Sequence, residues 1–252
     1  METESRTIEF EERNRVLVAV KKLCPRTAEI TLKWQNEVAA LRRVGGPDCI
    51  SMLFDSDFGD LSIILRRETV RSLDSWITVH TRTCCLSVEE SDVLWSQMAD
   101  ALAHVHAQDI IHDDVNPSNI MWDPETCKAV LIDFGAARYI SPNCVVSFDP
   151  SGTPPYVPPE FLDKKKGVAG DVWALGATML FVKRYIALPD GQWFLPNVFD
   201  QGQDRLELLE WFVEIQEVRR RVSGEDLLLI HALEVDLEKR ISSSSLATKL
   251  RE

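Results

Sequence analysis

The sequence has little positive charge. Its 28 Lys and Arg residues are outnumbered by 40 Asp and Glu residues, which gives a formal net charge of −12 at neutral pH. Proteins that bind nucleic acid need a basic surface to neutralise phosphates, so this balance argues against a nucleic-acid partner. The one basic run, Arg219-Arg220-Arg221, ends a strongly charged segment and is best explained as the solvated face of a helix.

The sequence also lacks the signals of metal-binding cysteines and of membranes. Its six cysteines include no C-x-x-C pair and no spacing typical of zinc ligands. No charge-free apolar stretch reaches the roughly 20 residues that a membrane span needs. The acidic start Met1–Ser5 has no apolar run of the kind found in signal peptides. We therefore expect reduced thiols, no membrane partner, and a cytoplasmic or nuclear protein.

Enough apolar residues are present for a folded core, since 45% of the 252 residues are hydrophobic and seven are Trp. The first quarter is rich in β-branched residues and predicts a hairpin over residues 7–23, a helix over 31–44, and strands over 50–54 and 61–65. The rest is mainly helical, with two short strands over 120–122 and 129–132. Residues 136–170 predict a long surface loop, and 171–182 a helix buried on all sides.

Two short segments near the middle of the chain carry the chemistry. Residues 112–119 read HDDVNPSN, and residues 133–135 read DFG. The first segment supplies Asp114, a carboxylate able to accept a hydroxyl proton, and Asn119, an amide able to bind Mg²⁺. Asp133 then supplies a second metal ligand in the order that phosphoryl transfer requires. Asp114 and Asn119 could each serve a turn instead, but their joint spacing argues against that alternative.

These segments resemble the catalytic and metal-binding loops of the eukaryotic protein kinases, Ser/Thr kinases in particular. The resemblance extends over about residues 18–250, and within it VAVK at 18–21 is similar to the strand whose Lys grips the phosphates of ATP. It implies that Lys21 binds nucleotide and that Glu37, on the helix that follows, is its carboxylate partner. It also implies an α+β fold of two lobes, with a truncated β-rich N-lobe over 1–67 and a helical C-lobe over 68–252.

The same resemblance implies where the nucleotide base would bind. Residues 61–77 align without gaps to the family's strand and hinge. Leu65 would then lie at the back of the adenine pocket, and the backbone around Arg67 would bond the base. An ordinary edge strand followed by a polar loop explains these residues almost as well.

Three downstream motifs separate protein kinases from small-molecule phosphotransferases. Residues 152–160 (GTPPYVPPE) resemble the end of a Ser/Thr kinase activation segment, and residues 171–176 (DVWALG) resemble the start of the family's buried helix. Arg240 resembles a late arginine that pairs with the segment's glutamate, here Glu160. Phosphotransferases of the aminoglycoside and choline type lack this segment and its arginine, so a protein substrate is favoured.

The sequence departs from the family at three places. The first glycine is Gly45, so no G-x-G-x-x-G loop precedes Lys21, and either a truncated gene product or an open phosphate site is expected. Asp113 replaces an Arg that pairs with a phosphorylated loop, which argues against activation by loop phosphorylation. Asn116 replaces a catalytic Lys, and losing such a stabilising group costs on the order of 10²-fold in rate.

Two hypotheses remain after these departures. The favoured one is a slow Ser/Thr protein kinase that uses ATP and Mg²⁺, with Asp114 and Asn116 as catalytic residues and Asn119 and Asp133 as metal ligands. The alternative is a pseudokinase scaffold or a kinase fragment that binds nucleotide weakly or not at all. The sequence does not identify the protein substrate or the oligomeric state.

Overall fold

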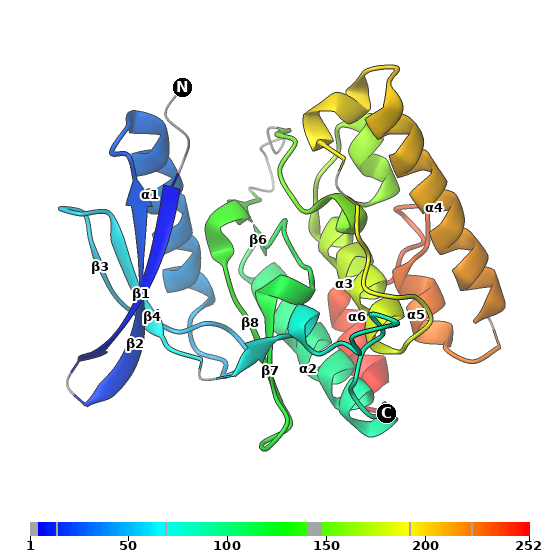
Figure 1. Ribbon diagram of the computed structural model, residues 1–252, viewed down its shortest axis with the longest axis horizontal. Coiled ribbons are helices and arrows are strands. Elements are labelled where there is room, and N and C mark those ends of the chain that lie inside the picture. The colour runs from blue at the N-terminus through cyan, green and yellow to red at the C-terminus, as the bar shows by residue number, and fades with distance from the viewer. Residues whose placement is uncertain (1–4, 14, 69, 141–147, 192, 223) are drawn as a thin grey trace.

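The computed structural model describes residues 5–13, 15–68, 70–140, 148–191, 193–222 and 224–252. Two lobes lie side by side in Figure 1, a small one made of a sheet and one helix and a larger one built mainly of helices. This arrangement is the α+β, two-lobed fold that the sequence predicts. The expected division between residues 67 and 68 falls in the segment that follows the last strand of the small lobe, and the division itself stays a prediction.

The small lobe contains an antiparallel sheet in the order β1-β2-β4-β3. Its strands are β1 (Ser5–Arg13), β2 (Val16–Cys24), β3 (Leu53–Asp57) and β4 (Ser62–Arg66). The β-branched residues of β2 favour an extended strand, and the predicted hairpin with β1 is confirmed. One helix, α1 (Ala28–Val44), packs on the sheet. The side chain of Thr27 caps its first turn by accepting from the Ile30 N–H.

One predicted strand is displaced by contacts between the lobes. The sequence pattern places a strand over residues 50–54, but β3 begins only at Leu53. Ile50 instead forms an isolated parallel bridge with Leu131 of the larger lobe, and the Ser51 N–H donates to the Leu131 carbonyl at 2.9 Å. The hydrogen-bonding capacity of this segment is therefore used to join the lobes rather than to lengthen the sheet.

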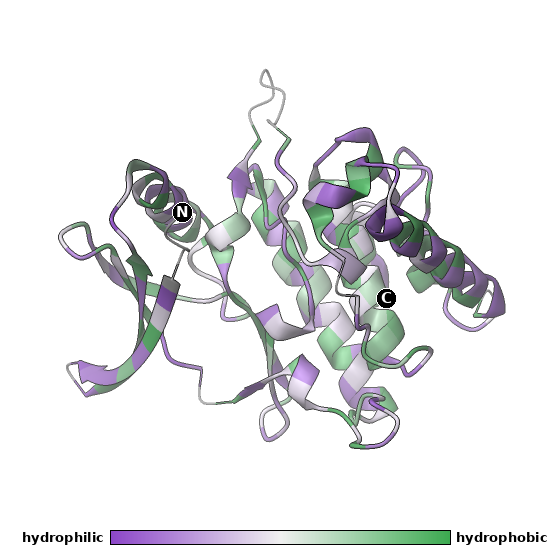
Figure 2. Ribbon diagram, turned by 45° about the horizontal axis from the view of Figure 1, so that its top comes forward, coloured by the Kyte–Doolittle hydropathy of each residue, from purple (hydrophilic) through white to green (hydrophobic). Residues whose placement is uncertain are grey.

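Helices α2 (Val88–Ala107) and α3 (Val168–Val182) run through the core of the larger lobe. Ser87 and Glu90 form a reciprocal capping box that fixes the start of α2. Twelve of the fifteen residues of α3 are buried, as the sequence predicts. Helices α4 (Gln203–Arg221), α5 (Leu227–Ala232) and α6 (Ser243–Leu250) surround this pair. In Figure 2 the centre of the lobe is largely hydrophobic, whereas α4 on the outside is largely hydrophilic.

Short strands between the lobes present the loops named from the sequence. The hairpin of β7 (Ile120–Asp123) and β8 (Lys128–Leu131) follows residues 112–119 and leads to residues 133–135. Strand β5 (Arg71–Ser72) adds to this hairpin, and β6 (Ile110–Ile111) pairs with β9 (Arg138–Tyr139). The two catalytic segments are thus held at one end of a single hairpin, because β7 and β8 are antiparallel neighbours.

Two expectations about the surface can be compared with the structure. Across the described residues, none of the helices combines the length and the apolar character needed to cross a membrane. Five described cysteines carry free thiols, namely Cys24, Cys49, Cys84, Cys85 and Cys127. Cys144 lies outside the described residues, together with the rest of residues 141–147 of the predicted surface loop.

Candidate active site

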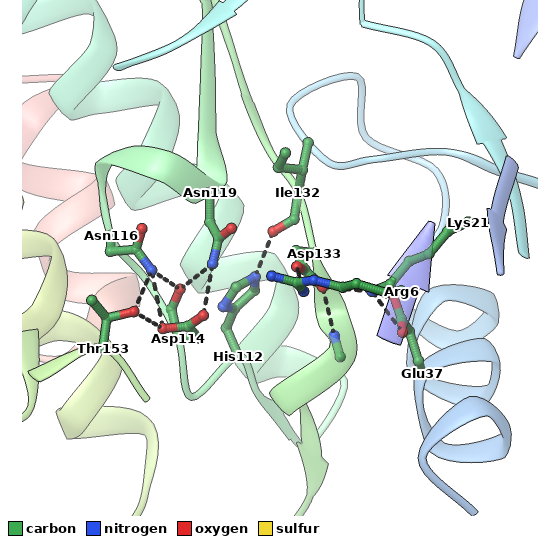
Figure 3. A network of polar contacts seen from close by, with 11 residues as sticks. Arg6, Lys21, Glu37, His112, Asp114, Asn116, Asn119, Ile132, Asp133 and Thr153 are labelled. Atoms are coloured by element: carbon green, nitrogen blue, oxygen red, sulfur yellow. Dashed lines mark hydrogen bonds and ion pairs between the residues drawn. The ribbon is translucent and has the colours of Figure 1, made fainter. Parts of the chain in front are cut away.

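The predicted pair of Lys21 and Glu37 is present at the small lobe's side of the cleft. Lys21 Nζ lies 2.7 Å from Glu37 Oε1 and 2.9 Å from Oε2, and both side chains are buried. Burial would lower the pKa of Lys21, but the carboxylates of Glu37 and Asp133 outweigh it and raise that pKa. The lysine therefore stays charged at neutral pH and is held in one position by its partners (Figure 3).

Asp133 faces this pair from the larger lobe. Its Oδ1 accepts from Lys21 Nζ at 2.8 Å and from the Gly135 N–H at 3.2 Å, while its Oδ2 accepts from Arg6 Nη1 at 2.8 Å. Burial by itself would raise the pKa of Asp133, but Lys21 and then Arg6 outweigh it and lower the pKa to about 2. Asp133 is thus an ionised carboxylate over the whole physiological range.

Gly135 packs closely against Asp133. A Cβ atom at this position would lie 3.1 Å from Asp133 Oδ1 and 3.4 Å from both Lys21 Nζ and Glu37 Oε2. The first contact would be tight and would require the Asp133 carboxylate to shift, whereas the other two are at ordinary van der Waals distance. The glycine of the DFG segment therefore leaves Asp133 undisturbed in the ion-pair network.

Asp114 and Asn119 are joined in the catalytic loop. Asn119 Nδ2 donates to the Asp114 carbonyl at 2.8 Å and to Asp114 Oδ2 at 2.9 Å. This fixes which way the amide points, and Figure 3 shows its nitrogen turned to Asp114. Burial raises the pKa of Asp114, while the hydrogen bonds from Thr153 and Asn119 lower it in part. A buried carboxylate with a raised pKa suits a general base.

Asn116 is turned away from the open cleft. Its Nδ2 lies 3.0 Å from Asp114 Oδ1, 3.0 Å from Thr153 Oγ1 and 3.1 Å from the Asp114 carbonyl, and its Oδ1 accepts from the Ser118 N–H. The side chain is buried, with only 3% of the residue exposed. These contacts favour a residue that positions Asp114 over one that touches a phosphate. The catalytic role predicted for Asn116 stays a prediction.

The base of the catalytic loop is tied to the buried helix α3 by Asp171. Its Oδ2 accepts from the His112 N–H at 2.7 Å, and its Oδ1 accepts from the Asp113 N–H at 2.9 Å. The predicted anchoring of the loop by Asp171 is confirmed. His106 Nε2 also contacts Asp171 Oδ2 at 2.9 Å, so this histidine is part of the anchor. The sequence indicates only a core or surface position for His106, and the structure adds its contact with Asp171.

His112 stabilises the loop through its ring. Its Nε2 contacts the Ile132 carbonyl at 3.0 Å, and its ring packs edge-on against Phe134 with 4.8 Å between centroids. His112 and Phe134 are both fully buried. This contact joins the catalytic loop to the DFG segment, so Asp114 and Asp133 are placed by one rigid unit, as the sequence reading of His112 as a support predicts.

The carboxylate of Asp113 is paired with two cations, Lys166 and Arg138. Its Oδ2 accepts from Lys166 Nζ and, at 2.8 Å, from Ser151 Oγ, and Arg138 Nε lies 3.4 Å away. The Lys166 side chain is only 4% exposed. In the family, an arginine at this position pairs with a negatively charged loop phosphate. Here an aspartate pairs with a positively charged lysine, so both charges of the contact are exchanged. The sequence offers Ser147 and Ser151 as weak candidates for phosphorylation in this segment, and Ser147 lies outside the described residues.

Leu65 and Arg67 belong to the predicted adenine side of the cleft. The sheet register places Leu65 opposite Ala19, and Ala19 opposite Phe10, so the three side chains share one face of the sheet. The Arg67 N–H donates to the Leu17 carbonyl at 3.3 Å, and the Arg67 guanidinium stacks 4.5 Å above the Phe10 ring. The N–H of Arg67 is therefore engaged within the protein, and its predicted contact with a base stays a prediction.

The predicted pair of Glu160 and Arg240 is present in the larger lobe. Arg240 Nη1 lies 2.6 Å from Glu160 Oε1, and Nη2 lies 2.8 Å from Oε2, in a buried bidentate contact. Arg240 also donates to the carbonyls of Glu234 and Ala169. The prediction that this pair is structural is confirmed in geometry, and it fixes the end of the activation segment.

One cleft of about 530 Å³ brings the two sides of the site together, and its lining includes Lys21, Glu37, Asp114 and Asp133. The residues fit a Mg²⁺-bound nucleotide. Asp133 is an ionised carboxylate, and the side-chain oxygen of Asn119 accepts no hydrogen bond from any described residue. Within the described part of the chain, no group of three His, Cys, Asp or Glu is arranged to hold a metal ion. Asn119 and Asp133 would therefore share the ion with phosphate and water, as Mg²⁺ sites commonly do.

Sequence reasoning missed three residues of the site. Arg6 reaches the cleft from β1, Phe10 of the same strand packs under the Arg67 guanidinium, and Thr153 Oγ1 donates to Asp114 Oδ1 at 2.6 Å. The alternation of side chains along the hairpin could have placed Arg6, Ile8 and Phe10 on the face of Lys21. No spacing rule predicts the contact of Thr153, because 39 residues separate it from Asp114.

Comparisons with known proteins agree with this geometry. The family model described as the protein kinase domain matches residues 7–249. The rat calcium/calmodulin-dependent protein kinase type 1B is 31% identical over 145 residues, which is 56% of this chain and 41% of the relative. The Caenorhabditis elegans death-associated protein kinase dapk-1 is 30% identical over 169 residues, or 66% of this chain and 11% of the relative. A probable cAMP-dependent protein kinase catalytic subunit of Encephalitozoon cuniculi is 31% identical over 146 residues, or 56% and 43%. The chain thus spans less than half the length of each of these relatives.

Proposed function

The chain belongs to the protein kinase family, and on that premise we propose that it transfers the γ-phosphate of Mg-ATP to Ser or Thr hydroxyls of a protein substrate. The observation that carries the proposal is one cleft in which Lys21 of the small lobe faces Asp133 and Asp114 of the larger lobe. Phosphoryl transfer needs a phosphate-binding cation, metal ligands and a proton acceptor in one place. All three are present within the described residues.

In this proposal Asp114 accepts the proton of the substrate hydroxyl. Thr153, Asn116 and Asn119 each hydrogen-bond its side chain, which limits the directions in which the carboxylate can point. Fixing the base before the substrate arrives removes an orientation cost from the reaction. A positioned general base contributes about 10²- to 10⁴-fold to rate.

Lys21 binds the phosphates in this proposal, while Asp133 and Asn119 bind the metal. Glu37 holds the Lys21 ammonium at the mouth of the cleft, so the lysine need not be ordered when nucleotide enters. Bound Mg²⁺ would screen the charge of the phosphates and stabilise the charge that develops during transfer. A cytoplasmic or nuclear location remains part of the proposal and is supported by the free thiols of the described cysteines.

The second candidate function is a pseudokinase scaffold that binds nucleotide weakly or not at all. Two observations favour it: the Arg6 guanidinium occupies Oδ2 of Asp133, and Asn116 is buried where the family has a phosphate-stabilising lysine. A small-molecule phosphotransferase is not favoured, because the Glu160–Arg240 pair and the segment that it fixes are features of protein kinases.

Thermal unfolding with and without Mg-ATP separates these functions. A ligand at 100 times its Kd stabilises the folded state by roughly 2.7 kcal/mol. We expect a Mg²⁺-dependent shift in the wild type, no shift in Asp133→Ala, and a retained shift without phosphotransfer in Asp114→Asn. No shift in the wild type would favour the scaffold, and full transfer by Asp114→Asn would overturn the role of Asp114. The matched control is Asp163→Asn, an exposed carboxylate outside the cleft.

A further inference from the structure

Arg6 lies at the phosphate end of the cleft. The β1–β2 register pairs Ile8 with Lys21 and Arg6 with Leu23, so Arg6 and Ile8 share the face of the sheet that carries Lys21. Arg6, Lys21 and Leu23 all line the same cleft. A long cationic side chain therefore projects from the edge strand directly beside the nucleotide-binding lysine, as Figure 3 shows.

The two cations divide one carboxylate between them. Arg6 Nη1 lies 2.8 Å from Asp133 Oδ2, and Lys21 Nζ lies 2.8 Å from Asp133 Oδ1. Lys21 is buried and is also bound to Glu37, whereas 61% of the Arg6 side chain is exposed. The bond to Asp133 uses one of the five N–H donors of the guanidinium. Arg6 is thus the partner that can leave Asp133 at low cost, because its head is already largely in water.

The charges that line the cleft are slightly negative in sum. Its carboxylates are Glu29, Glu37, Asp114, Asp133 and Asp149, and its cations are Arg6, Lys21, Lys33 and Arg138. Lys21 is shared between Glu37 and Asp133, so Arg6 is the second cation on Asp133. The strand that reaches this part of the cleft has no glycine, and its residues from Ser5 to Arg13 pair with β2. A paired strand that carries a guanidinium therefore lies beside Lys21, and the planar fork of that group matches phosphate oxygens.

We propose that Arg6 is a phosphate-binding arm with two positions. Without nucleotide it pairs with Asp133 and covers a metal-ligand oxygen; with a nucleoside triphosphate its guanidinium binds the phosphates and leaves Oδ2 free for the metal. The proposal rests on the proposed nucleotide binding and deepens it, since Arg6 makes the cleft selective for the polyphosphate part of the ligand. By the same exchange, Arg6 opposes the binding of a divalent cation alone.

Calorimetric binding of Mg-ATP and of adenosine tests the arm without any need for activity. Arg6→Ala should weaken Mg-ATP binding on the order of tenfold, as expected for one lost charge-assisted hydrogen bond at an exposed position, and should leave adenosine binding unchanged. Arg6→Lys should retain part of the affinity. The matched control is Arg13→Ala, which removes the same charge at the far end of the same strand.

A second measurement follows Mn²⁺ alone as a spectroscopic probe of the metal ligands. Arg6→Ala should bind Mn²⁺ at least as tightly as the wild type, because the competing guanidinium is gone. Equal Mg-ATP affinity in Arg6→Ala and wild type would overturn the arm while the proposed function stands. A parallel loss of adenosine binding would show a structural defect and also overturn it. If neither protein binds Mg-ATP, both the arm and the proposed function fail.

Discussion

The hydroxyl of Thr153 lies 2.6 Å from Oδ1 of Asp114, and it joins the activation segment to the catalytic loop across 39 residues of chain. Asn116 Nδ2 contacts both groups, at 3.0 Å from each, and closes a small triangle of hydrogen bonds. The orientation of the proposed base therefore depends on whether the activation segment is in place. The activation segment can therefore influence the reaction directly, without itself being phosphorylated.

Replacing Thr153 by Ala should lower the rate of phosphotransfer at least about tenfold, because a charged carboxylate loses one hydrogen bond. That bond lowers the pKa of Asp114 against the opposing effect of burial, so its loss should raise the pKa further. The base must be ionised to act, and the acid limb of the pH–rate profile should move to higher pH. Thr153→Ser keeps the hydroxyl and should keep the wild-type profile. An unshifted profile in Thr153→Ala would contradict the contact's electrostatic role.

Asp133 should contribute stability that disappears in acid. Its pKa is lowered from 3.8 to about 2 in the folded protein, so its contribution is present above pH 4 and is lost as the pH falls towards 2. The contribution corresponds to about 2 kcal/mol. Urea unfolding of wild type and Asp133→Asn should give free energies that differ by this amount at pH 7 and converge only at about pH 2 and below. A constant difference across that range would show that Lys21 and Arg6 do not stabilise the carboxylate.

The buried contact between Glu160 and Arg240 should show strong coupling. Removing either partner alone, in Glu160→Leu or Arg240→Met, leaves an unpaired buried charge and should cost about 3–5 kcal/mol. The double variant should cost clearly less than the sum of the two. A double-mutant cycle by urea unfolding measures this. The exposed pair of Arg251 and Asp100, also at 2.8 Å, is the control and should couple by about 1 kcal/mol or less. Additive costs at the buried pair would contradict the prediction.

Two neighbouring lysines should respond differently to substitution. The Lys166 side chain is 4% exposed and bonded to Asp113, whereas that of Lys165 is 62% exposed. Lys166→Met leaves Asp113 with one cation fewer and should cost about 3 kcal/mol, while Lys165→Met should stay within about 0.5 kcal/mol. Thermal unfolding measures both. The charge-exchanged double variant Asp113→Lys, Lys166→Asp should recover part of the loss. Equal effects of the substitutions at Lys166 and Lys165 would contradict a stabilising role for the ion pair of Lys166 and Asp113.

Much of this protein was determined by short stretches of its sequence. Residues 112–119 and 133–135 are close in the chain, and a loop and a tight turn bring their side chains together with little choice of arrangement. The helices followed from the spacing of apolar residues. The pair of Lys21 and Glu37 was implied by the resemblance to protein kinases, and it joins a strand and a helix that are sequence neighbours. In these cases local geometry restricts the result, so the pattern of residues is enough.

Only the tertiary structure decided the contacts that bring distant segments together. His106 meets Asp171 across 65 residues, and Arg6 meets Asp133 across 127 residues. Residues 50–52 do not belong to the predicted strand, because this segment hydrogen-bonds with Leu131 of the other lobe instead. No local propensity contains these contacts, because each depends on how the lobes pack and on which buried polar groups still need a partner. The contacts of Arg6 and Thr153 arise from that packing, which is why the sequence named the chemistry of the site but neither of these two residues.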